Sequence, residues 1–131
     1  MLLPKPPIFV VEGLDIGIYA SAEDAMRDLE PWWVRQKEGL VYDAEGRMLT
    51  PEISGLRVTE LIPEDPPAHA KELEAALRAF LKEIGEAIAD DPNCILPCLV
   101  DVAGKLSEKK HSRKHLRDAV VRTIKKLFEL I

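Results

Sequence analysis

Residues 40–49 read LVYDAEGRML, the pattern of two strands joined by a short turn. Two short runs that suit strands, 40–42 and 47–49, flank the four residues Asp43–Gly46. A polar segment that ends in glycine between two such runs is typical of a β-hairpin, because glycine adopts a positive φ without steric cost. We therefore expect a tight hairpin with Gly46 in the left-handed region, and an antiparallel sheet built around it.

Further strand-like segments lie on both sides of this hairpin. β-Branched and aromatic residues dominate 8–11, and apolar residues recur in 14–19 and alternate with polar ones in 56–62. Residues 32–34, Trp-Trp-Val, are predicted to form one more short strand. Together with the hairpin, these segments predict an antiparallel sheet of about five strands.

One helix is predicted within the sheet-forming region. Ser21 is a favourable N-cap, and Glu23 and Asp24 occupy the first turn, where the helix dipole stabilises anions. Pro31 is expected to end this helix, because the residue before a proline avoids the α conformation. The helix is therefore an insertion between two strands.

A proline-rich break at residues 63–67 divides the chain into a sheet-rich half, 1–62, and a helical half, 66–131. The chain of 131 residues has the length of one typical domain, and its 47% hydrophobic composition excludes wholesale disorder. The expected fold is a single α+β domain over 1–131. It has an antiparallel sheet of about five strands, one inserted helix and two to three C-terminal helices.

The helical half has the periodicity of packed helices. Apolar residues recur every three or four positions over about 68–90, which predicts a long amphipathic helix. Residues 95–106 predict a short apolar helix, and a last helix is expected over about 112–130. The apolar stripe of this last helix consists of Leu116, Val120, Ile124, Leu127, Phe128 and Ile131. The free edges of the sheet and the stripe of the 68–90 helix are candidate surfaces for a homo-oligomer.

Charge is distributed unevenly along the chain. Residues 1–104 contain nine basic and 20 acidic residues, a net charge of −11, whereas residues 105–131 contain nine basic and three acidic residues, a net charge of +6. The acidic body would repel phosphates, so we do not expect long nucleic acids to bind across it. A protein partner of opposite charge suits it better, and added salt would then slow their association.

Membrane insertion and secretion are not expected. The longest apolar run, 95–100, is far shorter than the about 20 residues that a transmembrane helix needs. The first residues lack the charged region and apolar core of a secretory signal. A cytoplasmic location is therefore expected, and in that compartment a structural disulfide is not the default.

The two cysteines and two of the histidines have the spacing of a zinc site. Cys94 and Cys98 are followed after twelve residues by His111 and His115, and this pattern falls within the range of two-Cys, two-His zinc fingers. Glu108, however, stands where a finger needs an apolar core residue, and the cysteines flank an apolar run that favours their burial as free thiols. We expect no cofactor and no stoichiometric zinc, and keep a zinc-supported nucleic-acid-binding protein as the alternative.

A basic segment precedes the last predicted helix. Its side chains Lys109, Lys110, Arg113 and Lys114 are candidates for binding an anion. Cations at a helix start oppose the helix dipole, so local helix stability does not explain them. The alternatives are a solvated loop or a contact with the acidic body.

Trp32 and Trp33 are the candidate partner-binding residues. In a strand, adjacent side chains point to opposite faces, so one indole would be buried and the other would face outward. Exposed tryptophan is enriched at the centres of protein interfaces. The alternative is that the 68–90 helix covers it.

Several short segments between residues 11 and 81 occur in a characteristic order: Gly13–Asp15, Tyr19–Ala25, Leu29–Pro31, Val41–Arg47 and Leu73–Leu81. In this order they resemble a loose group of small bacterial proteins of unknown function. The resemblance implies an accessory or immunity-type product, the kind that binds a partner toxin and blocks it, and it implies no catalytic residue.

Signatures of catalysis are missing from the sequence. No glycine-rich phosphate loop follows a strand, no serine lies in a nucleophile elbow, and no pair of carboxylates has apolar surroundings. We therefore expect no enzyme, with a small enzyme of unknown reaction as a second alternative. The leading hypothesis is a non-catalytic protein-binding module, which the resemblance specifies as immunity-like.

Overall fold

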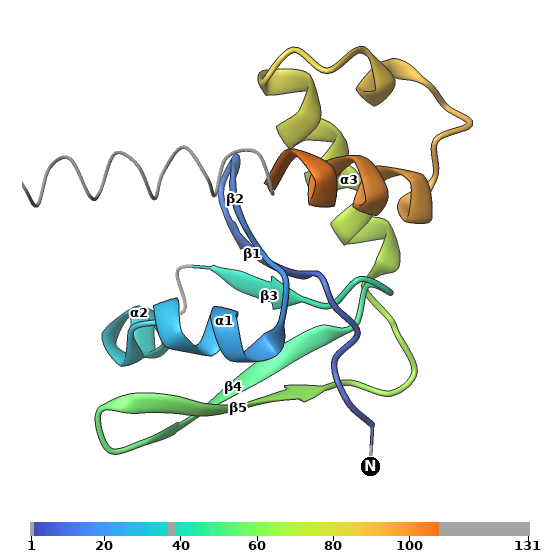
Figure 1. Cartoon of the computed structure of the whole chain (residues 1–131). Coiled ribbons are helices and arrows are strands. Elements are labelled where there is room, and N and C mark those ends of the chain that lie inside the picture. Colours follow the sequence, from blue (N-terminus) through green and yellow to red (C-terminus); the bar gives the residue numbers. More distant parts are fainter. Residues whose placement is uncertain (1, 37–38, 108–131) are drawn as a thin grey trace, which may run out of the picture.

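The computed structural model describes residues 2–36 and 39–107 of the chain (Figure 1). In this part of the chain, one antiparallel sheet has the strand order β2-β1-β3-β4-β5. Its strands are β1 (Ile8–Glu12), β2 (Asp15–Tyr19), β3 (Leu40–Tyr42), β4 (Met48–Ser54) and β5 (Arg57–Pro63). The helices are α1 (Ala22–Asp28), α2 (Pro31–Gln36), α3 (Ala70–Glu83), the 3-10 helix η1 (Ala87–Asp90) and a helical segment over 96–107. The predicted α+β fold is confirmed.

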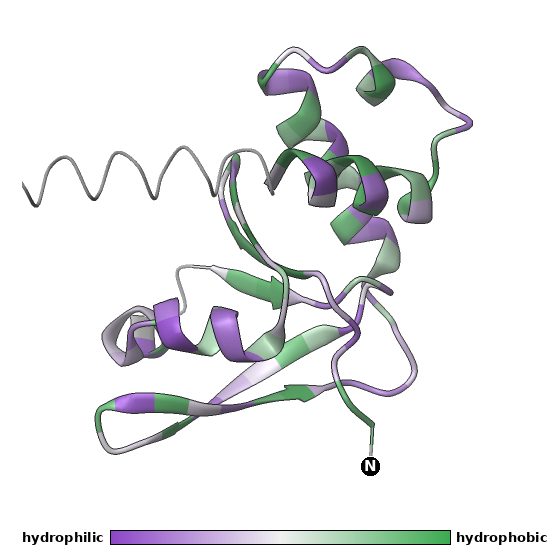
Figure 2. Cartoon of the chain, in the orientation of Figure 1, coloured by the Kyte–Doolittle hydropathy of each residue, from purple (hydrophilic) through white to green (hydrophobic). Residues whose placement is uncertain are grey.

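Helices cover both faces of the sheet. Ile8 and Phe9 in β1 are both fully buried, although adjacent strand residues point to opposite faces. Phe9 belongs to the cluster that α3 supplies, whereas Ile8 belongs to the cluster that α1 supplies. The unbroken apolar run at 8–11 follows from this burial on both sides. Figure 2 shows the contrast between apolar β3 (green) and the polar residues of α1 (purple).

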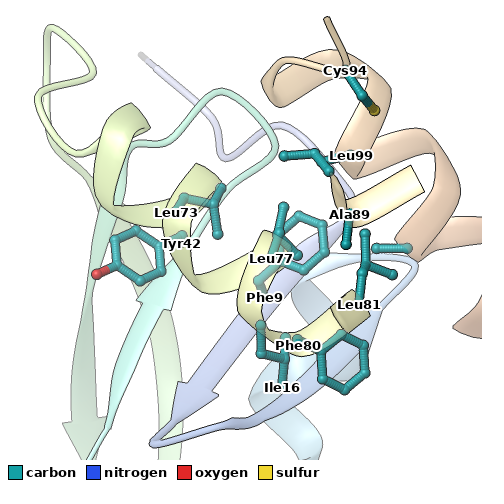
Figure 3. Packing of buried hydrophobic residues seen from close by; sticks show 11 residues of the cluster. Phe9, Ile16, Tyr42, Leu73, Leu77, Phe80, Leu81, Ala89, Cys94 and Leu99 are labelled. Carbon is teal, nitrogen blue, oxygen red and sulfur yellow. The ribbon is translucent and has the colours of Figure 1, made fainter. Parts of the chain in front are cut away.

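The larger of the two clusters lies between the sheet and α3 (Figure 3). Leu73, Leu77 and Leu81, four residues apart on α3, are fully buried against sheet residues that include Phe9 and Tyr42. A fully buried leucine contributes about 1.5–3 kcal/mol of hydrophobic stabilisation. The apolar face of α3 therefore provides the main contact between the helical half and the sheet.

The long helix predicted over 68–90 is in fact interrupted. α3 ends at Glu83, and Gly85 has a φ of +83°. The Gly85 and Glu86 amides donate to the carbonyls of Lys82 and Leu81 at 3.1 and 2.9 Å, which is a glycine-based C-cap. Residues 87–90 form η1 instead, because the chain turns back after this cap.

The prediction of a strand at residues 32–34 is wrong, because these residues form α2. Pro31 is the first residue of this helix, where a missing amide proton costs no hydrogen bond and the fixed φ suits a helix. Pro31 thus begins α2 rather than directly ending α1, which stops at Asp28. The predicted N-cap of α1 is confirmed, since the Ser21 Oγ accepts a hydrogen bond from the Asp24 amide at 3.1 Å.

The hairpin between β3 and β4 has the predicted turn. Gly46 has a φ of +84°, and its amide donates to the Asp43 carbonyl at 3.2 Å. The Asp43 amide donates to the Arg47 carbonyl at 2.9 Å and closes the loop. β4 continues to Ser54, beyond the predicted strand, because it pairs with β5 from Leu49 to Ser54.

Candidate functional site: an exposed tryptophan surface and a long groove

The two tryptophans of α2 have different environments. Trp33 is partly buried in the cluster that includes α1, and its ring lies directly over Gly39. A Cβ atom on Gly39 would lie 2.2 Å from the Trp33 Cζ2 atom, so only glycine fits beneath the ring. Trp32, the residue immediately before it, is 56% exposed. Trp33 therefore fixes α2 on the sheet, and Trp32 is available to a partner.

The predicted helix at 68–90 does not cover Trp32. α3 packs on the opposite face of the sheet from the cluster that contains Trp33. α2 and the turn between β4 and β5 lie at the same end of the molecule (Figure 1). Leu56 in this turn is 95% exposed, and Leu56 and Pro31 line the same shallow groove of about 430 Å³. We call Trp32, Pro31, Leu56 and this groove the Trp32 surface.

Charged side chains lie beside the apolar residues of this groove. Glu23, Arg27, Glu30 and Arg57 line the same groove. Arg27 is held in place by Asp24, whose Oδ1 accepts a hydrogen bond from the Arg27 Nη2 at 2.5 Å. An apolar centre with a charged rim is the usual composition of a protein–protein interface.

A second, larger groove has a volume of about 1360 Å³. The chain segment Lys5–Pro7 and the end of β2 form one side, and the helical segment 96–107 forms the other. The charged side chains at its rim are paired with each other: Lys5 with Glu45 at 3.0 Å, and Lys105 with Asp101 at 3.1 Å. This groove therefore offers apolar surface rather than a free catalytic group.

Cys94 and Cys98 form a disulfide, so the prediction of free thiols is wrong. The two Cα atoms are 5.2 Å apart, within the usual range for disulfides, because the cysteines flank the start of the helical segment 96–107. The burial predicted for Cys94 is correct, with 2% exposure. Free thiols are the default only in a reducing compartment, and the prediction rested on that expectation rather than on the spacing of the two cysteines.

The disulfide has a direct bearing on the zinc alternative. While Cys94 and Cys98 are bonded to each other, they have no thiolates to offer a metal. His111 and His115 lie outside the described residues, as do Lys109, Lys110, Arg113 and Lys114. Across residues 2–36 and 39–107, no group of three or more His, Cys, Asp or Glu side chains could hold a metal ion.

Arg78 ties the segment before the disulfide to α3. Its Nη1 donates to the carbonyls of Ala89 and Asp91, both at 2.9 Å, and its Nη2 donates to the Cys94 carbonyl at 2.7 Å. The predicted pair with Glu74 is also present, at 3.4 Å. The N–H groups of Arg78 donate to these three carbonyls, so its role is to position residues 89–94 rather than to bind a substrate.

Glu64 and His69 form the most strongly perturbed acid–base pair in the described part of the chain. The Glu64 Oε1 accepts hydrogen bonds from the amides of Met48 and Ala68 at 3.1 and 3.0 Å, and lies 2.5 Å from the His69 Nδ1. His69 and these amides lower the pKa of Glu64 to about 2. The same contact raises the pKa of His69. The Glu64 Oε1 contacts the Met48 and Ala68 amides and the His69 ring, so the pair joins the start of β4 to the start of α3.

Because of the Glu64–His69 pair, we expect the stability of the fold to pass through a maximum as the pH changes. The lowered pKa of Glu64 stabilises the fold above its ordinary value of 4.5, and this contribution is lost as the pH falls toward 2. The raised pKa of His69 stabilises the fold below 6.5, and this contribution is lost as the pH rises through the raised pKa. We expect the melting temperature of Glu64→Gln to fall furthest below that of the wild type between about pH 4.5 and 6.5.

His69→Gln is the control for this prediction. It should remove the loss of stability on the alkaline side and keep the acid loss, because the Met48 and Ala68 amides still contact Glu64. Thermal melts at steps of half a pH unit measure both variants. If the melting temperatures of Glu64→Gln and the wild type changed in parallel with pH, the pair would not contribute to the pH dependence of stability.

Sequence reasoning selected Trp32 but missed Leu56 and both grooves. The Leu-Arg-Val-Thr pattern of 56–59 indicates a strand, and nothing in it shows that Leu56 lies in the turn before β5. Within the described residues, no helix is long and apolar enough to cross a bilayer. Comparison of the chain with protein-family models, with curated proteins and with solved structures found no match.

Proposed function

We propose that this protein is a non-catalytic protein-binding module and that Trp32 anchors its partner. The observation that carries the proposal is the 56% exposure of Trp32 beside a tryptophan that is partly buried against the core. Truncation of a tryptophan anchor typically costs an interface 2 kcal/mol or more. Large exposed aromatic surface in a defined position is therefore best explained by a partner that covers it.

The Trp32 surface is held in a fixed position before any partner binds. Pro31 restricts the first turn of α2, and the Trp33 ring is seated over Gly39. Leu56 adds exposed apolar surface in the groove that Pro31 also lines. A preorganised surface loses little conformational entropy on association, which favours affinity.

The acidic body supports a partner with a basic surface. Residues 1–104 carry a net charge of −11, and a broad potential of one sign accelerates association with a protein of opposite charge. Small bacterial immunity proteins act in this general way, by binding and blocking a toxin, so an immunity-type role is the specific form of the proposal. The association rate should then fall as salt rises, with less effect on dissociation.

A comparison of three baits tests the proposal. The wild-type protein, Trp32→Ala and Ile95→Ala are each used to capture proteins from a lysate of the native cell. Ile95 is a matched control because it is 57% exposed but lies in the segment after η1, away from α2. We expect a partner that the wild type and Ile95→Ala retain and that Trp32→Ala binds about 30-fold more weakly in titration.

All three baits should melt at about the same temperature, because surface substitutions change stability by about 0.5 kcal/mol or less. A partner that binds all three baits equally would place the interface elsewhere. Failure of every bait to capture any protein at low salt would remove the support for a binding module.

A further inference from the structure

We propose that the larger groove is the docking site of this chain's own C-terminal segment, residues 112–131, which packs antiparallel to the helical segment 96–107. This inference is independent of the Trp32 surface. Its bases are the size of the groove, a glycine on its wall, and the place where the described chain ends.

The groove follows one side of the helical segment over its whole length. Leu96, Val100 and Gly104, each four residues after the last, line it, and so does Ser107 at the far end. Its volume of about 1360 Å³ exceeds the 300–1,000 Å³ of typical small-molecule clefts. An elongated groove along a helix has the shape that a second helix fills.

Gly104 is the residue on this wall that the described contacts do not explain. It lies inside a helix, where glycine is less stable than alanine, and a Cβ atom there would meet nothing within 4 Å. The described chain therefore gives no steric reason for glycine at this position. A small residue on a helix face allows the backbone of another helix to approach closely, which supplies the missing reason.

The described part of the chain ends at the groove. Ser107 lines it, and its Oγ donates a hydrogen bond to the Ile18 carbonyl at 3.1 Å. The 24 residues that follow therefore start within reach of the groove. Antiparallel helices need a connection of only about 2–8 residues, and residues 108–111 provide one.

The sequence of residues 112–131 suits the groove in two respects. Its apolar stripe, from Leu116 to Ile131, has the periodicity of a helix with one buried side. A helix over 112–130 would be about 28 Å long, enough to span the about 18 Å of the 12-residue segment 96–107. The +6 charge of residues 105–131 also opposes the −11 charge of residues 1–104, so long-range attraction favours contact within the chain.

The first test uses the sign of a stability change. In an empty groove, Gly104→Gln replaces a poor helix former by a good one with open space around it, and should raise the melting temperature. In a groove filled by residues 112–131, the same change should lower the melting temperature of the full chain. We expect the lowering.

Ile124→Asp provides the matched background for this test. It places a charge in the apolar stripe and should release the segment, so Gly104→Gln should become stabilising in the double variant. Such a change in the sign of the Gly104→Gln effect is expected if position 104 contacts the segment that carries Ile124. A rise in melting temperature for Gly104→Gln in both backgrounds would overturn the proposal.

The second test distinguishes docking within one chain from docking on a second copy. Full-length chains at natural abundance and labelled with ¹⁵N are mixed and treated with a carbodiimide, which joins lysines to nearby carboxylates. We expect links from Lys125 or Lys126 to Asp101, Glu45 or Asp24 within single chains, and their loss in Ile124→Asp. If these links join two copies, about half of them in an equal mixture join a labelled chain to an unlabelled one, and such mixed links would overturn the proposal in favour of a dimer. The absence of any link from these lysines to the groove would overturn it outright.

Discussion

Asp43→Ala is expected to lower the free energy of unfolding by about 3–5 kcal/mol. The Asp43 carboxylate is fully buried, and its Oδ1 accepts hydrogen bonds from the amides of Glu45 and Arg47, both at 2.9 Å. Its Oδ2 accepts a third from the Lys5 amide at 3.2 Å. Alanine would leave three backbone donors without their acceptor, and each buried unsatisfied donor costs about 1–3 kcal/mol.

Arg47 adds to this expected loss. Its side chain is 13% exposed and its Nη1 lies 3.9 Å from the Asp43 Oδ2. Within the described residues, the Arg47 Nε is buried without a hydrogen-bond partner, so this cation depends on the carboxylates of Asp43 and Glu45. Asp43→Ala would leave a nearly buried guanidinium with one of its two carboxylates.

Urea denaturation of the wild type, Asp43→Ala and Asp43→Asn measures the effect. Asparagine keeps an oxygen that can accept from the Glu45 and Arg47 amides, and replaces the second oxygen by a donor that faces the Lys5 amide. We expect it to lose less stability than alanine. A loss below about 1 kcal/mol for Asp43→Ala would mean that water or other groups satisfy these donors.

Gly46→Val is expected to lower the free energy of unfolding by about 3–5 kcal/mol, for two reasons that add. The φ of +84° is strained for a β-branched residue. A Cβ atom would also lie 2.3 Å from the Ala70 Cα and 2.8 Å from the Ala70 amide nitrogen. These are backbone atoms at the start of α3, so the helix itself would have to move.

Gly55→Val is the matched control for this clash. Gly55 has a φ of +65° in the β4–β5 turn, and a Cβ atom there would meet nothing within 4 Å. It should cost only the conformational strain, about 1–2 kcal/mol. Equal losses for the two variants in urea denaturation would contradict the close approach of Gly46 to α3.

The difference between these two glycines shows where prediction from sequence ends. The Asp43–Gly46 turn and its positive φ can be predicted from residues within four positions of one another. This local information predicts a backbone strain of about 1–2 kcal/mol when Gly46 is substituted. The contact that raises the expected loss joins Gly46 to Ala70, 24 residues later. No local pattern contains that distance, because the packing of α3 on the sheet creates it.

Local chemistry also determined the Ser21 cap, the amphipathic α3 and the antiparallel sheet, since each depends on neighbouring residues or a short period. Residues 32–34 form a helix despite their strand propensity. Pro31 favours a helix start, and the Trp33 ring packs over Gly39, and together these override the local preference. The exposure of Trp32 and Leu56 depends on which elements meet at one end of the sheet. Local sequence patterns therefore predict most of the elements and the turn chemistry, but not the helix at residues 31–36 or the end of α3 at Glu83. Which side chains stay exposed follows only from the tertiary structure, because burial depends on contacts between distant segments.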